Sequence, residues 1–399
     1  MNTPLPVAII GGGPAGALAA ATLAERGRRA LLFDEKLAWE KPCGGGLTHK
    51  ALQQYPFLAE AGSAVNTIDQ CELIGPSGQR VRFRMRHPVA ILSRFALNGF
   101  LLDRARKSGA DVRHERITRA EGSPGNWRLL SARGEYRASF LLLAAGARNP
   151  LRTQFLPPIS SDDLVVTAGY FIPGQFPLIQ IQFLKEASGY IWVFPRPDHA
   201  SVGIAGKMGE LPTRQLRCLL EEWIAANGYS LEGASFYSHI LPSFRSPTLS
   251  TLQVSGDGWA MIGDSAGLVD PITGEGLYYA LRSAELCAEA LLADRPERYP
   301  ARLHEEIVPE LALAARVSHR FYRGRVFGGS VLERMIALTA HSPSFRDLMS
   351  DLFAGTQGYS DLKARLYRIL PAVMTEGLGS SLAPAWLRSG KLAIDVTPE

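Results

Sequence analysis

The chain opens with a strand, a turn, a helix and a second strand. Val7–Ile10 is an uninterrupted apolar run, which is typical of a buried strand. Glycines follow directly, and residues 15–26 are rich in alanine and have the spacing of a helix. A second apolar run over residues 30–33 ends at Asp34. This alternation predicts a βαβ unit whose two strands lie parallel in one sheet.

From about residue 65 to residue 245 the pattern changes to short segments in which apolar and polar positions alternate. Residues 65–92 indicate a hairpin around a turn at residues 75–78. Alternation with frequent proline and glycine turns predicts an antiparallel sheet with one buried face. Further strands are expected at residues 165–171, 178–183, 190–195 and 201–205, and helices at residues 94–107 and 212–227.

A second strand-to-helix junction lies farther along the chain. The apolar run 259–262 precedes a glycine-rich stretch, residues 263–276, and Leu277–Leu292 then has the spacing of a long helix. Residues 140–145 form another apolar run that predicts a buried strand. After residue 297 the pattern is mostly helical, with clear segments at 311–316 and 331–338 and a loose tail after about residue 380.

Together these elements predict an α/β protein with an α+β second lobe. A Rossmann-like nucleotide-binding domain is assembled from residues 1–64, 93–160 and 250–296. An antiparallel-sheet domain, residues 65–92 and 161–249, is inserted between those segments. Residues 297–399 form a helical C-terminal region.

Composition and charge exclude several classes of protein. With 399 residues, 46% of them hydrophobic, the chain buries a large core, and it has no low-complexity tract. The net charge of +5 comes from scattered basic residues, mostly arginine, so we expect no nucleic-acid partner. Two uncharged stretches, residues 4–23 and 164–184, contain glycine or proline turns, and we therefore predict no membrane span.

Four cysteines stand far apart in the sequence and form no C-x-x-C pair. They are Cys43, Cys71, Cys218 and Cys287. This usage favours a reducing, cytoplasmic compartment and argues against a disulfide framework or a structural metal.

The first turn carries a dinucleotide-binding fingerprint. Gly11 permits a tight turn, Gly13 lets the backbone approach a pyrophosphate, and Gly16 allows close packing of helix and strand. Asp34 stands about 20 residues farther on, where a carboxylate holds a ribose hydroxyl pair. The strand, helix and acid around the glycines make this fingerprint specific.

Two other glycine-rich segments carry candidate chemistry. Asp264 follows a strand and precedes Gly274 and Gly276 at a helix entry, so that a carboxylate and backbone N–H groups are available to a polyol and a negative charge. The second segment is the run Cys43-Gly44-Gly45-Gly46. It is either a simple flexible loop or a bare backbone surface that lies against a flat ligand, with a thiol at its edge.

With these motifs in place, the chain resembles the FAD-dependent oxidoreductases of the aromatic-hydroxylase fold and, more narrowly, the geranylgeranyl reductase family. The resemblance covers about residues 5–295. It is carried by Gly11 to Gly16 with Asp34, by Pro42-Cys43-Gly44-Gly45-Gly46-Leu47, by Arg94, by Gly189-Tyr190-Ile191-Trp192-Val193-Phe194-Pro195 and by residues 263–276.

The resemblance implies that FAD is the cofactor and assigns residues to its parts. The adenosine diphosphate half would be contacted by Gly11, Gly13, Ala15, Gly16 and Asp34, and the adenine by the backbone of Ile117. Arg94 would lie near the pyrophosphate and the ribityl chain, and Asp264 would bind the ribityl chain. The isoalloxazine would be flanked by Gly44 and Gly46, and its N1 and O2 atoms would face Gly274, Gly276 and Leu277. A helix N-terminus at that last position stabilises the negative charge of the reduced ring.

The substrate site is expected along the strand at residues 190–195. Tyr190, Trp192 and Phe194 alternate and therefore project from the same face. They are either a stripe of core aromatics or, as the resemblance implies, the wall of a substrate cavity. Cys43 is either buried filler or a residue that touches substrate, as a proton donor or by its shape.

By resemblance, the protein is an FAD-dependent reductase that saturates carbon–carbon double bonds of an apolar prenyl chain. A prenyl lipid as substrate implies transient contact of a cytoplasmic protein with a membrane. Hydroxylases usually have an Asp-Gly pair where this chain has Ala145-Gly146, and no second dinucleotide fingerprint follows a strand. The external electron donor, NAD(P)H or a ferredoxin-like protein, therefore stays open.

Two alternatives remain. A flavin monooxygenase or halogenase shares the fold and acts through a flavin C4a-hydroperoxide, but a halogenase strand usually reads Trp-x-Trp-x-Ile-Pro, whereas this chain has Tyr190 and Phe194 at the outer positions. The chain also has only eight lysines, and none stands where a halogenase lysine is expected. The third reading is a flavoprotein that binds a ligand without turnover.

Overall fold

The computed structural model describes residues 4–326, 329–381 and 394–395. The chain divides into two compact units, each assembled from three separate segments. Unit 1 contains Met1–Lys41, Ser93–Leu164 and Ile240–Ala315, and unit 2 contains Pro42–Leu92, Val165–His239 and Arg316–Glu399. The segment Pro42–Leu92 and the helices after Arg316 thus belong to the same unit as the larger sheet.

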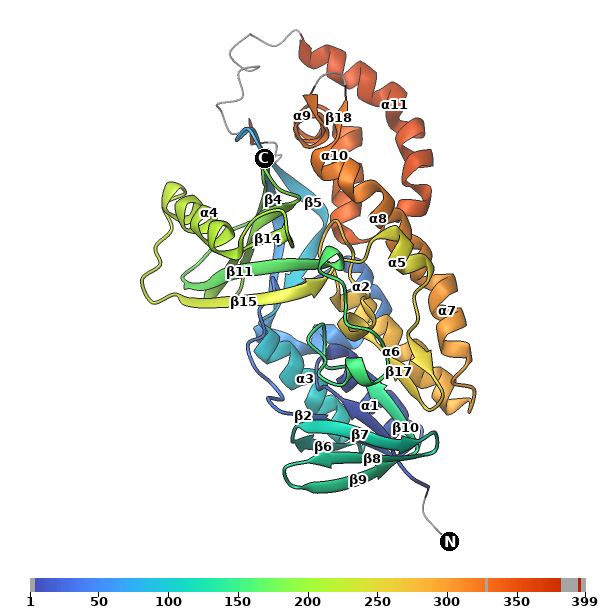
Figure 1. The fold of residues 1–399 in the computed structure, drawn as a ribbon. Helices are drawn as coiled ribbons and strands as arrows, with labels where there is room; N and C mark the ends of the chain where they lie inside the picture. Colours follow the sequence, from blue (N-terminus) through green and yellow to red (C-terminus); the bar gives the residue numbers. More distant parts are fainter. Residues whose placement is uncertain (1–3, 327–328, 382–393, 396–399) are drawn as a thin grey trace. The chain divides into compact units, whose positions relative to one another are not determined.

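Unit 1 is built on a six-stranded sheet with the order β16-β17-β10-β1-β2-β6 (Figure 1). Its strands are β1 (Val7–Ile10), β2 (Ala30–Asp34), β6 (Asp111–His114), β10 (Phe140–Leu143), β16 (Ser255–Gly256) and β17 (Trp259–Met261). All neighbouring strands are parallel except β16 and β17. The predicted βαβ unit and Rossmann-like sheet are confirmed, and β1 is buried along its whole length.

The helices predicted at residues 15–26, 94–107 and 277–292 are confirmed, a short helix at residues 246–250 was not predicted, and the helix at residues 298–306 falls in the region expected to be helical. The helices of unit 1 are α1 (Pro14–Glu25), α3 (Arg94–Lys107), α5 (Ser246–Ser250), α6 (Leu277–Leu292) and α7 (Arg298–Glu306), with short 3-10 turns at Arg152–Gln154, Ser161–Asp163 and Gly263–Ala266. Ser93 caps α3, because its hydroxyl accepts the Ala96 N–H at 3.0 Å. Helix α1 is largely alanine and glycine, and it packs against both α3 and α6.

A three-stranded meander of unit 1 was not predicted. It consists of β7 (Ile117–Ser123), β8 (Asn126–Ser131) and β9 (Gly134–Ala138). Charged side chains interrupt the apolar alternation in these strands, so the sequence carries only a weak strand signal there.

Unit 2 contains a nine-stranded sheet with the order β15-β11-β14-β13-β12-β4-β5-β20, and β3 pairs with β5. Its strands are β3 (Gly46–Leu47), β4 (Asn66–Ile74), β5 (Arg80–Ile91), β11 (Leu164–Pro173), β12 (Ile179–Phe183), β13 (Gly189–Pro195), β14 (His199–Lys207), β15 (Ser235–Pro242) and β20 (Ile394–Asp395). The predicted hairpin and antiparallel sheet are confirmed, although β12 pairs in parallel with β4 and β20 in parallel with β5.

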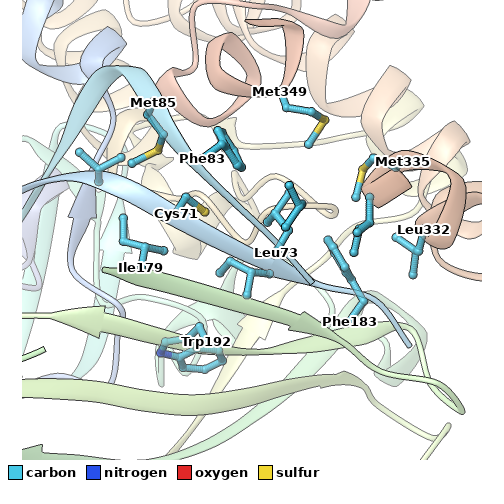
Figure 2. Close-up of a cluster of buried hydrophobic side chains, with 14 of the residues drawn as sticks. Cys71, Leu73, Phe83, Met85, Ile179, Phe183, Trp192, Leu332, Met335 and Met349 are labelled. Carbon is cyan, nitrogen blue, oxygen red and sulfur yellow. The ribbon is translucent and has the colours of Figure 1, made fainter. Parts of the chain in front are cut away.

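Side chains of this sheet and of the helices that pack on it form two apolar cores. The remaining elements are α2 (His49–Gln54), a 3-10 segment (Pro56–Ala64), α4 (Thr213–Ala226), α8 (Val308–Arg323), β18 (Arg325–Val326), β19 (Gly329–Ser330), α9 (Val331–His341), α10 (Pro343–Ala354) and α11 (Tyr359–Ser381). Leu216 and Trp223 of α4 pack with Val193 of β13 in one core. Trp192 belongs to the other core, together with Met335 from α9 and residues of α10 and α11 (Figure 2).

The helical character predicted for the C-terminal region is confirmed over the part that the structure describes. The loose tail predicted after residue 380 falls almost entirely outside the described residues. Along the described chain, no helix is both long and apolar enough to span a bilayer.

Candidate flavin and substrate sites

The carboxyl edge of the unit 1 sheet gathers the predicted nucleotide-binding residues. Strands β1, β2, β10 and β17 are parallel, so their carboxyl ends meet at one edge. The loops that leave this edge begin at Gly11, Glu35, Ala144 and Ile262, so that Asp34 ends its strand and Asp264 lies just beyond the last of these loop starts. Segments more than 200 residues apart in the sequence therefore supply one site in unit 1.

The three glycines of the first turn have different structural requirements. Gly11 has a φ of +114°, and a Cβ there would lie 2.4 Å from the Ala144 carbonyl oxygen. A Cβ on Gly16 would lie 1.9 Å from the Gly11 carbonyl oxygen, so only glycine permits this close approach of helix to turn. A Cβ on Gly13 would meet no protein atom within 4 Å. Gly13 therefore faces open space at the start of α1, where a pyrophosphate is predicted to lie.

Asp34 is hydrogen-bonded to the backbone of the glycine turn. Its carboxylate accepts the Gly12 N–H at 2.6 Å, the Lys36 N–H at 2.7 Å and the Leu37 N–H at 2.6 Å. These bonds hold the carboxylate at the carboxyl end of β2, directly beside the glycine turn. Each carboxylate oxygen can accept more than one hydrogen bond, so this position is compatible with the predicted ribose contact.

Arg94 is a buried cation at the start of α3. Its side chain is 4% exposed, and its guanidinium donates to Asn98 Oδ1 at 3.2 and 3.3 Å. The Glu40 carboxylate accepts the backbone N–H of Arg94 at 2.9 Å, whereas the guanidinium itself forms no ion pair with a carboxylate of the described residues. A buried positive charge held by a neutral amide is expensive unless an anion accompanies it. Arg94 thus fits the predicted role beside a pyrophosphate.

Asp264 lies in the turn after β17, as predicted, and it has a partner that the sequence did not indicate. Lys41 Nζ lies 3.1 Å from Asp264 Oδ2, and both side chains are 16% exposed. A Cβ on Gly276 would lie 3.4 Å from Asp264 Oδ1, so the carboxylate also borders the entry of α6. The only sequence signal for Lys41 is its position directly before the Pro42-Cys43 glycine run.

The entry of α6 places Gly274, Gly276 and Leu277 at the same edge. Gly274 has a φ of +72°, and Gly276 is the N-cap residue before Leu277. Glu275 already accepts one N–H of the first turn, that of Tyr278, at 2.7 Å. The predicted role of this helix end toward flavin N1 and O2 therefore depends on the N–H groups other than that of Tyr278.

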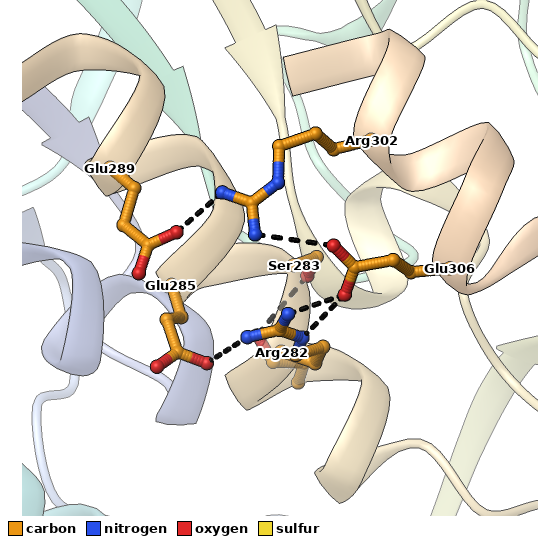
Figure 3. Close-up of polar contacts among 7 residues, drawn as sticks. Arg282, Ser283, Glu285, Glu289, Arg302 and Glu306 are labelled. Atoms are coloured by element: carbon orange, nitrogen blue, oxygen red, sulfur yellow. Dashed lines mark hydrogen bonds and ion pairs between the residues drawn. The ribbon is translucent and has the colours of Figure 1, made fainter. Parts of the chain in front are cut away.

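Two sets of contacts hold α6 in place behind this entry. The Ser283 hydroxyl accepts the Gly263 N–H at 3.0 Å and so ties α6 to the turn that carries Asp264. A network of ion pairs then joins α6 to α7, in which Arg282 and Arg302 both contact Glu306 (Figure 3). Since these charges are partly exposed, the network mainly orients the two helices.

Ala15 and Ile117 are the two remaining residues of unit 1 that are predicted to contact the cofactor. Ala15 is buried at the start of α1, and a Cβ on Gly263 would lie 3.2 Å from its Cβ. Ile117 is buried at the first position of β7. Its backbone contact with adenine stays a prediction.

In unit 2, the Cys43 glycine run is covered by an aromatic ring of the protein. A Cβ on Gly44 would lie 2.9 Å from Phe194 Cδ2, and a Cβ on Gly46 would lie 3.0 Å from Phe194 Cε1. The run is therefore bare because Phe194 packs flat on it, and Gly46 pairs with Ile91 as part of β3. The side of Gly44 and Gly46 that would carry a Cβ faces Phe194, so the predicted contact with the isoalloxazine would have to involve other atoms of these glycines. That contact stays a prediction.

A fully buried arginine, which the sequence did not single out, holds the same run. Arg196 is 0% exposed, and its Nη2 donates to the Cys43 carbonyl oxygen at 2.8 Å. Its Nη1 lies 3.0 Å from His199 Nε2, and its guanidinium lies 4.9 Å from the Phe171 ring centroid. The Cys43 thiol is half-buried and accepts the Gly45 N–H at 3.3 Å. Arg196 thus fixes the conformation in which the thiol is presented.

The aromatic stripe of β13 lies on one face, as predicted. Trp192 is buried in the apolar core of Figure 2, and Tyr190 and Phe194 pack against the same core while remaining half-buried. Trp192 Nε1 donates to Ser201 Oγ at 3.3 Å, and that hydroxyl lies 2.8 Å from the Tyr237 hydroxyl. Burial raises the pKa of Tyr237 far above its usual value, so this phenol stays protonated at neutral pH.

The predicted residues thus fall into two groups. Unit 1 brings together Gly11, Gly13, Ala15, Gly16, Asp34, Arg94, Asp264, Gly274, Gly276 and Leu277, and unit 2 contains Cys43, Gly44, Gly46, Tyr190 and Trp192. Within the described ranges, no cluster of His, Cys, Asp and Glu is arranged to hold a metal ion.

Sequence comparison finds relatives over most of the chain. Residues 9–62 match a family described as an NAD(P)-binding Rossmann-like domain. A geranylgeranyl diphosphate reductase of Synechocystis sp. is 25% identical over 324 residues, which cover 72% of this chain and 75% of that protein. A digeranylgeranylglycerophospholipid reductase of Methanopyrus kandleri is 28% identical over 348 residues, 78% of this chain and 89% of that protein.

Solved structures share the fold over nearly the whole chain. A geranylgeranyl bacteriochlorophyll reductase-like protein of Thermoplasma acidophilum superposes with a TM-score of 0.74 at 20% identity, covering 92% of this chain and 99% of that one. A flavin-dependent brominase gives a TM-score of 0.70 at 18% identity, with the same coverage. In fold and in its glycine turn the chain is similar to flavin-dependent oxidoreductases. Within this class, the chain is a relative of the geranylgeranyl reductases, as its motifs predict.

Replacing Asp264 by alanine is expected to weaken FAD binding by about tenfold or more, or ~1.4 kcal/mol, because the predicted ribityl contact would be lost. Lys41→Met is the matched control, since it removes the other half of the ion pair. Flavin content after gel filtration and the dissociation constant from fluorescence titration measure both variants. Equal losses in the two variants would mean that only the ion pair matters, and unchanged occupancy in Asp264→Ala would contradict the assigned role.

Proposed function

We propose that this FAD-dependent oxidoreductase reduces carbon–carbon double bonds of a prenyl chain carried by a lipid or pigment. The observation that carries the proposal is the similarity of the chain to relatives named as prenyl reductases. In unit 2, Trp192 is packed in an apolar core with the methionines Met85, Met335 and Met349 (Figure 2), whereas Tyr190 and Phe194 on the same face of β13 stay half-buried.

In this proposal, unit 1 residues bind the cofactor. Gly13 leaves room for the pyrophosphate, Arg94 neutralises its charge, Asp34 holds the ribose and Asp264 the ribityl chain. Reduced FAD, when bound, supplies the hydride for one alkene carbon, while a proton completes the other carbon. The contact of Gly44 and Gly46 with the flavin, which the resemblance implies, stays a prediction.

Two side chains are proposed as candidate proton donors. Cys43 has a thiol that is half-buried and held in place by the contact of Arg196 with its carbonyl group. Tyr237 is the second candidate, because its hydroxyl is hydrogen-bonded to Ser201, but burial raises its pKa and so makes it the weaker acid. Replacing each residue singly, Cys43→Ala and Tyr237→Phe, identifies the donor as the variant that slows saturation while still binding substrate.

A product assay tests the proposed function. The flavin is reduced without oxygen, a small panel of prenyl lipids and prenyl diphosphates is added, and the products are analysed by mass spectrometry. We expect flavin reoxidation and a gain of two hydrogen atoms for each saturated bond. Oxygen consumption with insertion of an oxygen or halogen atom would instead support the monooxygenase or halogenase alternative. Binding without any turnover would support the non-enzymatic one.

The electron donor is tested in the same assay. NADPH, NADH and a reduced ferredoxin are offered separately to the oxidised protein, and the loss of the oxidised flavin absorption band is followed. We propose that one of these two classes of donor, a nicotinamide or a ferredoxin-like protein, reduces the flavin at a useful rate. Failure of all three would contradict this part of the proposal.

A further inference from the structure

Helix α11 has an apolar outer face. Leu366, Tyr367, Leu370 and Met374 are between 39% and 66% exposed. Three of these residues are spaced four apart, so they line one side of the helix. The solvent-facing side of a surface helix is normally polar. We call these four side chains the outer stripe.

The opposite face fixes α11 within unit 2. Val373 is buried in the apolar core that contains Trp192 and Met335. Near the C-terminal end of the helix, the Glu376 carboxylate accepts the Ser344 hydroxyl at 2.8 Å. Nearer its start, Arg365 Nη2 lies 2.6 Å from Asp351 Oδ2. Turning the outer stripe inward would break these contacts, so the stripe faces outward in the folded unit.

Cations border the outer stripe. Lys363 and Arg368 are exposed, and between residues 362 and 375 the helix contains no acidic side chain. Lys363 Nζ lies 5.9 Å from the Tyr367 ring centroid. From residue 316 to residue 376 the chain has nine Lys and Arg against five Asp and Glu, so this segment holds most of the net charge of +5.

We infer that the outer stripe of α11 docks onto an anionic lipid bilayer. A helix of this kind lies in the plane of the interface, with its apolar face among the acyl chains and its cations at the headgroups. A second copy of the chain is a poorer occupant, because a symmetric contact through the stripe would bring Lys363 and Arg368 of both copies together. The choice of a lipid surface also rests on the proposed function, since a prenyl lipid is reached from a bilayer.

Flotation with vesicles tests this inference on the full-length holoprotein. Two vesicle types are compared, one of equimolar phosphatidylglycerol and phosphatidylcholine and one of phosphatidylcholine alone. The stripe variant carries Leu366→Gln, Tyr367→Gln, Leu370→Gln and Met374→Gln. The charge variant carries Lys363→Gln and Arg368→Gln. Phe236→Gln is the matched control, because Phe236 is an exposed aromatic residue of β15 outside the stripe.

We expect the wild type and the control to float with the anionic vesicles, and the stripe variant to bind at least tenfold more weakly. The charge variant should lose the preference for phosphatidylglycerol, and high salt should weaken wild-type binding. Flavin content and melting temperature should match the wild type in both variants, since their side chains face outward.

Three results would overturn the inference. They are wild-type protein that does not float, a stripe variant that floats as well as the wild type, and a wild-type dimer that the stripe substitutions convert to a monomer without any vesicle binding. Vesicle binding is measured without turnover, so it is independent of the proposed function. Binding without prenyl reduction would refute only the proposed function, whereas reduction of a water-soluble prenyl diphosphate without vesicle binding would refute only this inference.

Discussion

Replacing Gly16 by alanine is expected to destabilise unit 1 and to abolish retention of FAD. The new Cβ would lie 1.9 Å from the Gly11 carbonyl oxygen and 3.2 Å from Ala144 Cβ. Helix propensity alone favours alanine over glycine by about 1 kcal/mol. Overpacking against backbone costs about 1–3 kcal/mol or more, and here the backbone atom cannot move without opening the turn. The clash therefore outweighs the propensity gain.

The measurement for Gly16→Ala is thermal unfolding of the flavin-free protein together with flavin content after purification. A net loss of about 2 kcal/mol corresponds to a fall of roughly 5 °C in melting temperature. A variant that melts like the wild type and stays yellow would contradict the close approach of α1 to the turn.

Gly13→Ala is the matched control because the same substitution, three residues earlier, meets open space. Gly13 has a φ of −70°, which alanine adopts freely, and its Cβ would have no protein neighbour within 4 Å. The flavin-free variant should be as stable as the wild type or slightly more stable. FAD should nevertheless bind about tenfold or more weakly, because the methyl group would occupy the space assigned to the pyrophosphate. Unchanged affinity would place the phosphates elsewhere.

The backbone geometry of the glycine turn in unit 1 was largely predictable because its signals are local. Gly11, Gly13 and Gly16 need only the adjacent strand and helix to be recognised, and Asp34 ends the next strand. The parallel pairing of β1, β2 and β10 then follows from the βαβ pattern and brings the loops to one edge. Residues whose type is required by the neighbouring strand, turn or helix were therefore identified from the sequence.

Contacts between distant residues were not predictable. Lys41 and Asp264 are 223 residues apart, and Arg196 and the Cys43 carbonyl are 153 residues apart. Nothing in the local pattern distinguishes these two cations from the many other basic residues of the chain. The glycine run shows the same limit, because its lack of side chains is explained by packing under Phe194. A pattern that indicates a flat partner does not say whether the partner is a cofactor or a side chain.

Arg196 is the residue whose removal should most affect unit 2. A fully buried guanidinium there donates to the Cys43 carbonyl oxygen and contacts His199. The turn that it holds is also constrained by Gly45, which has a φ of +85° and whose Cβ would lie 2.0 Å from the Leu92 carbonyl oxygen. Without the arginine, the Cys43 carbonyl group loses its charged donor. Leaving such a buried group unsatisfied costs about 1–3 kcal/mol.

Arg196→Met should therefore loosen the Cys43 turn while FAD stays bound, since the glycines and Asp34 that are proposed to hold the nucleotide lie in unit 1. In a Cys218→Ser background, which removes the exposed thiol, Cys43 should react with a maleimide about tenfold faster than in the parent, corresponding to ~1.4 kcal/mol of easier local opening. Cys71 and Cys287 are buried and should stay unreactive. Arg196→Lys keeps the charge but has one ammonium for the two partners, and it should restore only part of the protection.

The control for this pair of variants is Arg217→Met, which removes a surface arginine of α4 that pairs with Glu221. Its thiol reactivity, flavin content and melting temperature should equal those of the parent. If the proposed reduction is also measured, Arg196→Met should lower kcat more than it raises KM, because a displaced thiol impairs proton delivery rather than uptake of an apolar chain. Unchanged maleimide reactivity in Arg196→Met would show that the arginine does not position Cys43, and the turn would then be held by Gly45 and Phe194 alone.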